Sequence, residues 1–534
     1  MLSLTIVVGG SGGTLNLAAS LFNGANQVFK TGFNYIQIGN ASGTGGITVN
    51  ASTTVNDDLR LVQGSGAISI NAALTLGSVG AYKNLLLQTT GSGTEDTTNG
   101  GIIASGLQLL GSGGSYVLGS PYNQISTLAG DTGSVDFTNN QGYAVTTVTN
   151  GTVNPTSTTG IITTAGDIDL NKCATSTDGY IAINAELNSG GGNIVLDASG
   201  VGGETKNGST QGSGSTSAIV ANGLILLGSG SHTLTNTGNQ VSLLAGAGSA
   251  GDITGTGTVI FTDSHTLSIG SLSHGGVSTN GLNSSGDVTM TIVGSLIQSQ
   301  LLEVDGTLSG SATSVNLNNS FNTIAKLGAT STQGTITLND SVNLNLTGAV
   351  NSNGGAVSLY GNGVSSSSTS TVNAGGGDIL VDGGGAGAIN LAGKLTTTST
   401  DASAVVVQNG SSAVLGVIGA HSGGVVIGKD NSVDFSGGVS QTAGTAILAN
   451  TLSGGSGGSI GGSVNLNHTG NAIATLGAFS SSGAFTFYDD AQLSVTGLVS
   501  GTSVDIETNG SNNGINLNSS LTANNKVISN KEYT

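Results

Sequence analysis

The stretch that decides the fold is Ile181–Gly200, which reads Ile-Ala-Ile-Asn-Ala-Glu-Leu-Asn-Ser-Gly-Gly-Gly-Asn-Ile-Val-Leu-Asp-Ala-Ser-Gly. Its apolar residues alternate in two short runs, which begin at Ile181 and Ile194. Alternation at period two predicts strands with one buried face, and the Gly/Asn/Ser cluster between the runs predicts a reversal. Such a unit cannot bury its own apolar face, so it needs a similar unit above and below.

Looser copies of this stretch recur at Ile68–Leu74, Leu344–Leu359 and Val372–Val381. Equivalent aliphatic residues return roughly every 20–26 positions, which is the perimeter of one β-helix coil built from three short strands. Long apolar stripes of helical period are absent from the sequence. We therefore predict an all-β protein, a parallel β-helix (solenoid) of roughly two dozen coils with no significant helix.

A larger repeat is visible on top of the coil pattern. The heptad Asn-x-φ-x-x-Leu-(Ala/Gly), in which φ is Ile or Val, occurs at Asn123–Ala129, Asn239–Ala245, Asn322–Gly328 and Asn471–Gly477. Each copy is followed by alternating strands, and three of these strands run into an aspartate, namely Asp263, Asp340 and Asp489. We expect four copies of one structural unit, with whole coils inserted or lost between them.

The domain organisation expected from this pattern is simple. Residues 1–60 are predicted to form irregular N-terminal coils, residues 61–520 a continuous β-helix shaft with degenerate repeats, and residues 521–534 a frayed C-terminal tail. The Gly/Ser/Thr-rich stretches Gly91–Gly101, Thr205–Ser217 and Ser365–Thr371 are predicted to be loops that stand off the shaft.

Composition excludes several classes of protein. The chain has 534 residues and 93 glycines without a Gly-X-Y period, which excludes collagen. Only 7% of its residues are charged, the net charge is −18, and Arg60 is the only arginine. A binding surface for nucleic acid or for anionic lipid requires clustered cations, so neither partner is expected. No apolar run approaches the roughly 20 residues of a membrane helix, so membrane insertion is not expected either.

Two further features bear on export. Cys173 is the only cysteine, so there is no intrachain disulfide framework, and we expect this thiol to be a small, partly buried apolar residue. The N-terminus lacks the basic region and cleavage site of a signal peptide and reads like another strand. We expect that the chain is a piece of a longer protein or begins mid-protein.

The residues that could carry chemistry show no convincing arrangement. The adjacent pairs Asp57-Asp58 and Asp489-Asp490 would point to opposite faces of a strand, and tryptophan, the usual sugar platform, is absent, so we interpret these pairs as solvated turn acids. The five histidines lack metal spacing and are interpreted as surface or turn residues; they are His232, His265, His274, His421 and His468.

We therefore predict no catalytic, cofactor-binding or metal-binding residues, and a protein that is not an enzyme. Gly375–Asp378 shares only part of the tandem Gly-Gly-x-Gly-x-Asp calcium repeat, so no cofactor is expected beyond weak Ca²⁺ binding at isolated Asp turns. Asn71, Asn184 and Asn516 occupy matched turn corners. They are either stacked amide ladders along the coil axis or ordinary turn residues, and the sequence does not decide between these two.

The repeats resemble those of the filamentous-haemagglutinin-like exoproteins of bacterial two-partner secretion, which are large surface adhesins. The residues that carry the resemblance are Ile181–Leu187, its shorter form Ile68–Leu74, and the blocks Leu109–Ala129 and Leu226–Ala245. The resemblance covers most of residues 45–520 and implies a right-handed β-helix shaft that is exported through an outer-membrane secretion partner. The family's Asn-Pro-Asn secretion motifs are missing, because Pro121 and Pro155 are the only prolines.

Two functional classes follow. The first is an extracellular or cell-surface structural and adhesive shaft, which contacts host or neighbouring cell surfaces or glycans and associates end to end through exposed strand edges. The alternative is a β-helix polysaccharide-processing enzyme or a phage tailspike-like protein, which acids and aromatics converging in one groove would favour. An ice- or mineral-binding surface would need ranks of threonine, and the threonines here are too scattered.

Overall fold

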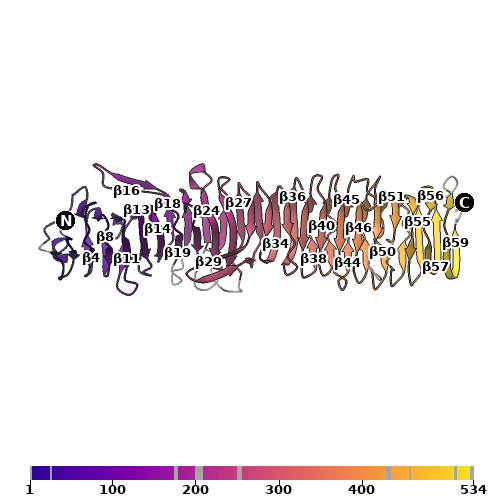
Figure 1. Ribbon diagram of the computed structural model, residues 1–534, viewed down its shortest axis with the longest axis horizontal. Helices are drawn as coiled ribbons and strands as arrows, with labels where there is room; N and C mark the ends of the chain where they lie inside the picture. Colours follow the sequence, from indigo (N-terminus) through magenta and orange to yellow (C-terminus); the bar gives the residue numbers. More distant parts are fainter. Residues whose placement is uncertain are drawn as a thin grey trace. The chain divides into compact units, whose positions relative to one another are not determined.

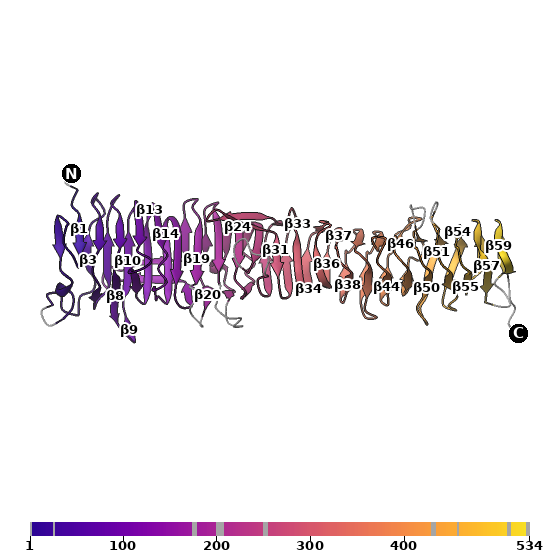
Figure 2. The same ribbon diagram turned by 90° about the horizontal axis from the view of Figure 1, so that it is seen from below.

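The computed structural model describes residues 3–24, 27–172, 179–198, 208–248, 255–428, 434–455, 459–509 and 514–529. The chain divides into two compact units, Met1–Gly286 (unit 1) and Asp287–Thr534 (unit 2). In each unit the chain winds into coils whose strands pair in parallel with those of the neighbouring coils (Figures 1 and 2). The described residues contain about 20 coils and no α-helix, which confirms the predicted all-β parallel solenoid.

One continuous column of strands shows how unit 1 is built. It runs through β1 (Ile6–Val8), β4 (Ile47–Val49), β7 (Ile68–Ile70), β11 (Ser92–Glu95), β13 (Gly106–Leu118), β14 (Thr127–Asn139), β19 (Ile168–Lys172), β22 (Asn193–Asp197), β24 (Ile219–Leu227) and β26 (Gln240–Ala247). The register stacks Ile168 on Ile194 and Ile194 on Leu224, all fully buried. Each such side chain stabilises the fold by roughly 1.5–3 kcal/mol through burial.

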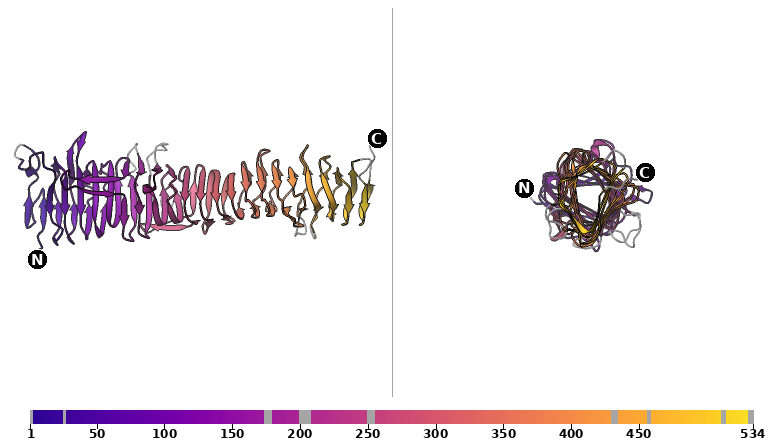
Figure 3. Two further views of the ribbon diagram at one scale, coloured as in Figure 1. Left: turned by 90° about the horizontal axis from the view of Figure 1, so that it is seen from above. Right: turned by 90° about the vertical axis from the view of Figure 1, so that its right-hand side faces the viewer.

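The coils of unit 2 have three sides, which Figure 3 shows end-on in orange and yellow. The first side contains β35 (Val315–Leu317), β37 (Ile336–Asn339), β40 (Val357–Tyr360), β43 (Ile379–Asp382), β46 (Val405–Gln408), β49 (Gly424–Ile427) and β51 (Ile447–Ser453). The second contains β38 (Leu344–Leu346), β41 (Val364–Ser366), β44 (Ile389–Leu391), β47 (Ala413–Leu415), β50 (Val439–Gln441), β52 (Val464–Leu466), β55 (Phe485–Asp489), β57 (Val499–Thr508) and β59 (Leu521–Ser529). The third begins with β39 (Ala349–Asn351), β42 (Thr371–Asn373), β45 (Lys394–Thr396) and β48 (Val417–Gly419), and continues through residues 447–449 of β51 into the start of β53 (Ala472–Leu476). The later residues of β51 and β53, followed by β56 (Leu493–Val495) and β58 (Ile515–Leu517), continue the first side.

The deciding stretch forms one coil of this kind. It contributes β20 (Tyr180–Ile183), β21 (Leu187–Asn188) and β22, so the turn predicted between two strands also contains a short third strand. Leu187 is the fully buried residue of that third strand. A coil of three strands rather than a simple reversal is what allows every strand to pair in parallel with its copy in the next coil.

The three stretches predicted to be loops instead contain paired strands. β11 lies within Gly91–Gly101, β23 (Gly208–Gln211) lies within Thr205–Ser217, and β41 and β42 lie at the ends of Ser365–Thr371. Small residues are accommodated in these strands because side chains of a neighbouring coil fill the interior. A side chain at Gly93 would lie 2.2 Å from the Tyr116 ring, which is fully buried in the next coil. The loop prediction was therefore wrong for these strands.

The ends of the chain also differ from the expected irregular coils and tail. In unit 1, β2 (Leu15–Leu17) pairs with β1, and the 3₁₀ turn η1 (Ala19–Leu21) leads to Phe22, which is buried and stacks on Phe29 at a centroid distance of 5.1 Å. These residues are therefore paired and packed rather than irregular. In unit 2, the predicted tail begins inside β59, which pairs with β57, and residues 530–534 lie outside the described part.

Three antiparallel hairpins among the described residues depart from the coil pattern. The shortest pairs the end of β8 (Ala73–Ser78) with β9 (Ala81–Tyr82), and the two longer ones are straps. The first strap, Thr147–Thr159, is formed by β16 (Thr147–Asn150) and β17 (Thr156–Thr159). The second strap, Ser271–Asn280, is formed by β29 (Ser271–His274) and β30 (Val277–Asn280). Figure 1 shows β16 and β29 lying across the coils of unit 1 rather than parallel to their strands. Val148, which follows the first heptad in the sequence, therefore belongs to the first strap and not to a coil strand.

Candidate functional site

The four predicted heptads place their asparagines in equivalent buried corners. Asn322 shows the arrangement most fully. Its Oδ1 accepts hydrogen bonds from the backbone N–H of Leu302 (2.9 Å) and from Nε2 of Gln298 (2.8 Å). Its Nδ2 donates to Oε1 of Gln298 (2.9 Å) and to the carbonyl oxygens of Leu317 (3.2 Å) and Asn339 (3.0 Å). One side chain thus ties together backbone groups from successive coils.

The same bonds recur at the other heptads, with one change of residue type. Each corner has a first residue that ends a strand, the heptad asparagine one coil later, and a third residue that ends a following strand. Corner 1 is Glu95, Asn123 and Asn139; corner 2 is Gln211, Asn239 and Asp263; corner 3 is Gln298, Asn322 and Asp340; corner 4 is Gln441, Asn471 and Asp489. Every corner therefore combines one carboxyl group with two amides.

The third residue of each corner caps the backbone inside its heptad. Asp340 Oδ1 accepts from the N–H of Ile324 (3.2 Å) and Asp489 Oδ1 from the N–H of Ile473 (3.0 Å). Burial raises the pKa of Asp340 to about 6 and that of Asp489 to about 7, despite these opposing hydrogen bonds. The sequence pattern indicated these aspartates but not the Gln or Glu partners, which lie 24 to 30 positions before each asparagine at the end of a strand.

One acid of each adjacent pair is buried, so the interpretation as solvated turn acids was wrong for Asp57 and Asp489, whereas Asp490 is exposed. Asp489 is fully buried in corner 4, and Asp57 is 6% exposed. The carboxylate of Asp57 accepts hydrogen bonds from the N–H groups of Gly32 (3.1 Å) and Phe33 (3.3 Å). Asp58 accepts from the N–H of Asn84 (2.9 Å). These acids hold turns and coil ends by satisfying backbone donors, which is a structural role.

The histidines are dispersed among unrelated environments. His232 was predicted at the surface, which is wrong, because it is fully buried in β25 (Ser231–Leu234) with its Nδ1 2.8 Å from Oγ of Ser209. Burial lowers the pKa of His232 to about 4, so the ring is neutral at physiological pH. His421 is exposed at a turn, while His468 contacts the Gln441 carbonyl with Nε2 (3.3 Å) and His265 contacts Ser264 Oγ with Nδ1 (2.9 Å).

His274 is the histidine with a charged partner. It lies at the tip of the second strap and forms an ion pair with Asp169, whose carboxylate is buried on the outward side of β19. Asp136 stands beside Asp169 in the same parallel register. The hydrogen bond with Asp169 raises the pKa of His274, and the charges of Asp169, Asp136 and Asp167 act in the same direction, against the effect of burial. The strap thus neutralises an outward acidic cluster.

The body of the second strap covers an outward apolar cluster on unit 1. Leu272 packs against Val195, Ile225, Leu227 and Ala245, with Leu243 at the edge. Gly223 leaves room for this contact, because a Cβ there would lie 2.5 Å from Cδ2 of Leu272. The second strap is therefore complementary to the surface beneath it: Leu272 lies on apolar side chains and His274 on acidic ones.

We expect the second strap to loosen as pH rises. Because the folded state raises the pKa of His274, the ion pair contributes stability fully below the ordinary value of 6.5 and loses it as pH rises through the folded-state pKa. Amide hydrogen exchange of β29 and β30 should therefore accelerate with pH beyond its intrinsic increase. The His274→Gln variant should show the faster exchange already at low pH, whereas the exposed control His421→Asn should not. Equal protection in wild type and His274→Gln at every pH would contradict this prediction.

The first strap is fixed by the only arginine. Arg60 donates from Nε to Oδ1 of Asn150 (2.8 Å) and from Nη2 to the Asn150 carbonyl (2.7 Å), and its guanidinium lies 3.5 Å from the centroid of the Tyr35 ring. Asn34 donates to the carbonyl of Val153 at the tip of the strap. Composition pointed to Arg60 only as evidence against anion binding, whereas it is a buried structural clamp.

The other predicted positions have ordinary structural roles. Asn71 donates from Nδ2 to Oδ1 of Asn50 (3.0 Å) one coil earlier, so this corner forms an amide ladder, whereas Asn184 makes a backbone bond to Val145. Asp378, in the partial calcium motif, accepts from Oγ of Ser399 (2.6 Å). Within the described ranges, no three His, Cys, Asp or Glu side chains are grouped so as to hold a metal ion. Cys173 lies outside the described residues.

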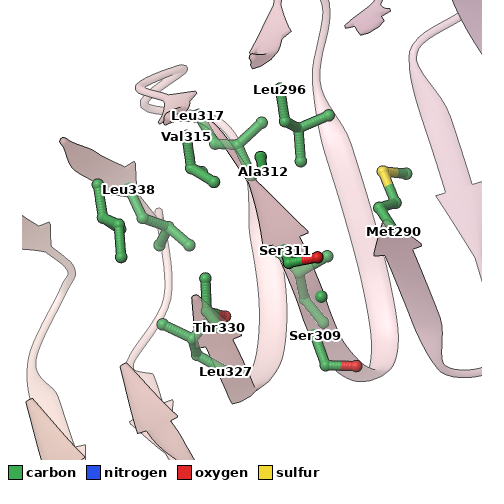
Figure 4. Close-up of a pocket in the computed structure, with 13 residues that line it drawn as sticks. Met290, Leu296, Ser309, Ser311, Ala312, Val315, Leu317, Leu327, Thr330 and Leu338 are labelled. Atoms are coloured by element: carbon green, nitrogen blue, oxygen red, sulfur yellow. The ribbon is translucent and has the colours of Figure 1, made fainter. Parts of the chain in front are cut away.

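A small cavity lies among inward-facing side chains of unit 2 (Figure 4). Its lining is mostly apolar and includes Met290, Leu296, Leu308, Val315 and Leu327. Its volume of about 20 Å³ has room for one water molecule and not for a sugar or cofactor. It lies where β34 (Leu302–Ala312) shifts register against β36 (Thr323–Thr332), so imperfect coil stacking accounts for it.

No protein family, curated protein or solved structure gives a significant match to this chain. Among the described residues, no helix has the length and hydropathy needed to cross a lipid bilayer. The outward strand faces, the corners and the straps of the two units are therefore the features that bear on function.

Proposed function

We propose that the chain is a structural and adhesive shaft of a filamentous-haemagglutinin-like bacterial surface protein, located outside the cell. The observation that carries the proposal is the regular outward wall of unit 2. On its second side the register places Asn345, Ser365 and Asn390 in one row, on successive parallel strands. Strands spaced about 4.8 Å apart present these amides and hydroxyls at regular intervals.

Such a wall suits a neutral polar partner. Asn343 donates from Nδ2 to Oγ of Ser365 (2.9 Å), so part of the row is already oriented by contacts between coils. Amide and hydroxyl groups form hydrogen bonds with sugar hydroxyls in both directions. The net charge of −18 disfavours polyanionic partners. Glycans on host or neighbouring cells are therefore the proposed partners, and export through an outer-membrane secretion partner and end-to-end self-association belong to the same proposal.

The test is binding of purified protein to a glycan array and to whole cells. We expect binding to neutral glycans, and we expect the double variant Asn345→Lys and Asn390→Lys to reduce it by at least about tenfold, because about 1.4 kcal/mol lost at the wall corresponds to that factor. Asp305→Lys, at an exposed position of β34, serves as a control for added positive charge. Absence of binding to any glycan or cell surface would contradict the adhesive role. Electron microscopy of the purified protein tests end-to-end self-association, because it distinguishes single particles from fibres.

The second candidate is a polysaccharide-processing enzyme, which one specific observation favours. Asp136 and Asp169 are neighbours in one outward register, and burial together with the charge of Asp169 raises the pKa of Asp136. Two carboxyl groups of unequal pKa are the usual requirement of glycoside hydrolysis. Against it, His274 already pairs with Asp169 and occupies this position. Release of reducing ends from polysaccharides that is lost in Asp136→Asn would support this candidate over the shaft.

A further inference from the structure

Three of the four corners contain a buried carboxylate oxygen that has no hydrogen-bond partner. These atoms are Oε1 of Glu95, Oδ2 of Asp340 and Oδ2 of Asp489. The other oxygen of each carboxyl group accepts at least one hydrogen bond. Glu95 Oε2 accepts from Nδ2 of Asn123 (2.8 Å) and from the N–H of Ser120 (3.1 Å). A buried oxygen without a partner carries a desolvation penalty, so what faces each of these atoms determines its protonation.

The repeat itself shows what faces Glu95 Oε1. In the other corners the equivalent residue is a glutamine, and its Nε2 donates to Oδ1 of the heptad asparagine at 2.6 Å in corner 2, 2.8 Å in corner 3 and 2.9 Å in corner 4. By this equivalence Oε1 of Glu95 lies where a donor is required, opposite the acceptor Oδ1 of Asn123. An ionised carboxylate supplies only acceptors there, whereas a protonated one supplies the missing donor.

Corner 1 supplies the reciprocal comparison for the aspartates. There Asn139 takes the aspartate position: its Oδ1 accepts from the N–H of Ile125 (3.1 Å) and its Nδ2 donates to the carbonyl oxygen of the same residue (3.0 Å). Asp340 and Asp489 reproduce the first of these bonds with Oδ1. Their Oδ2 atoms therefore take the place of the amide nitrogen and face the backbone carbonyl of Ile324 or Ile473.

We propose that Glu95, Asp340 and Asp489 each bind a proton when the chain folds, and that the resulting carboxylic acids replace amides as hydrogen-bond donors within their corners. The three corners then act as a built-in pH-sensitive device, which tightens the coils around them as pH falls and loosens them as it rises. The proposal does not depend on the proposed function.

The electrostatic surroundings agree with this geometry. Burial raises the pKa of Glu95 to about 7, of Asp489 to about 7 and of Asp340 to about 6. Asp490 adds a repulsive charge beside Asp489, and within the described residues no charged group contributes at Glu95 or Asp340. Burial also raises the pKa of Asp263 in corner 2 to about 6, but its geometry is different, because both its oxygens accept backbone bonds and His265 stands beside it.

The direction of the pH dependence follows from linkage. A carboxyl whose pKa is higher in the folded than in the unfolded state binds more protons when folded. Stability is then unaffected below the ordinary values of 3.8 to 4.5, falls as pH rises through about 6 and 7, and levels off above that range. This trend is opposite to that of an ordinary protein whose native carboxylates are ion-paired.

The experiment compares thermal unfolding of the full chain at pH 5 and pH 8. We expect Glu95→Gln, Asp340→Asn and Asp489→Asn each to raise Tm at pH 8, by about 5 °C or more, and to raise it by less at pH 5, where the folded carboxyls still hold their protons but those of the unfolded chain are already ionised. Asp263→Asn should have a smaller effect, and the exposed control Asp305→Asn should have none. Unchanged or lower Tm at pH 8 in the three corner variants would overturn the proposal.

A second measurement does not depend on variant stability. Infrared spectra of the wild-type chain at pH 6 should contain the carbonyl band of protonated carboxylic acids, which should be absent in the unfolded chain at the same pH. The band should weaken in each single corner variant, and by more for Glu95→Gln and Asp489→Asn than for Asp340→Asn, because the pKa of Asp340 lies at the pH of the measurement. Absence of the band in the folded wild-type chain would overturn the proposal whatever the variants do.

Discussion

Replacement of Val381 by aspartate is expected to unfold much of unit 2. Val381 is fully buried and stacks between Leu359 and Val407 of the adjacent coils. An ionised carboxylate in this column has no partner, and burying one costs on the order of 5 kcal/mol even after it takes up a proton or admits water. A typical domain is stable by only about 5–15 kcal/mol. Loss of the cooperative transition in chemical denaturation, followed by circular dichroism, would confirm the expectation.

The neighbouring residue provides the matched control. Leu380 carries the same type of side chain one position earlier, but it points outward and is partly exposed between Ser358 and Val406. Leu380→Asp should therefore change the free energy of unfolding by no more than about 1 kcal/mol. Equal damage from the two substitutions would contradict the inward and outward assignment on which the whole solenoid depends.

The second large effect is expected from Asn322→Ala. The substitution removes five hydrogen bonds. It leaves the N–H of Leu302 buried without its partner and takes from the Gln298 amide both of its bonds to the corner asparagine. Buried polar groups that lose a partner cost about 1–3 kcal/mol each, so the free energy of unfolding should fall by about 3–5 kcal/mol. Urea denaturation of the full chain measures this loss directly.

Asn390→Ala is the corresponding control, because Asn390 lies exposed on an outward row of the same unit. Its substitution should leave the urea midpoint within experimental error. A similar loss in both variants would mean that corner 3 has no special stabilising role and that asparagine content alone matters.

The column of buried aliphatics could be predicted because its signal is repeated many times. Apolar residues alternate with a period of two within each strand and return once in each coil. These two periods identify Ile168, Ile194 and their equivalents without knowledge of any contact. The heptad asparagines were identified for the same reason, since four copies align. Parallel stacking follows, because only equivalent residues of successive coils can superpose in this way.

The partners of those asparagines were not predictable from the same signal. Glu95 and Gln211 end strands rich in Gly, Ser and Thr, which resemble loops, because their interior is filled by Tyr116 and by His232 from neighbouring coils. A polar residue at the end of a strand is interpreted as solvated when the coil that packs beside it is not known. Asp57 and Asp489 were misinterpreted for that reason.

The straps could not be predicted because their sequences alternate like coil strands. Val145 and Val148 are separated by three positions and read as one strand, yet one faces the interior and the other belongs to the first strap. The pairing partner of a short alternating strand depends on its contacts with outward residues such as Arg60 and Val195. These residues are distant in the sequence, so the pattern of a single sequence does not reveal the contacts.

The hydrogen bonds between Arg60 and Asn150 affect how unit 1 unfolds. In a simple solenoid each coil depends only on its neighbours, so the stack can peel open one coil at a time from either end. Because the first strap joins residues 90 positions apart in the sequence, the coils between them are held in one loop. The contacts of the first strap must break before these coils can open one by one, so proteases that attack fraying ends should cut more slowly there.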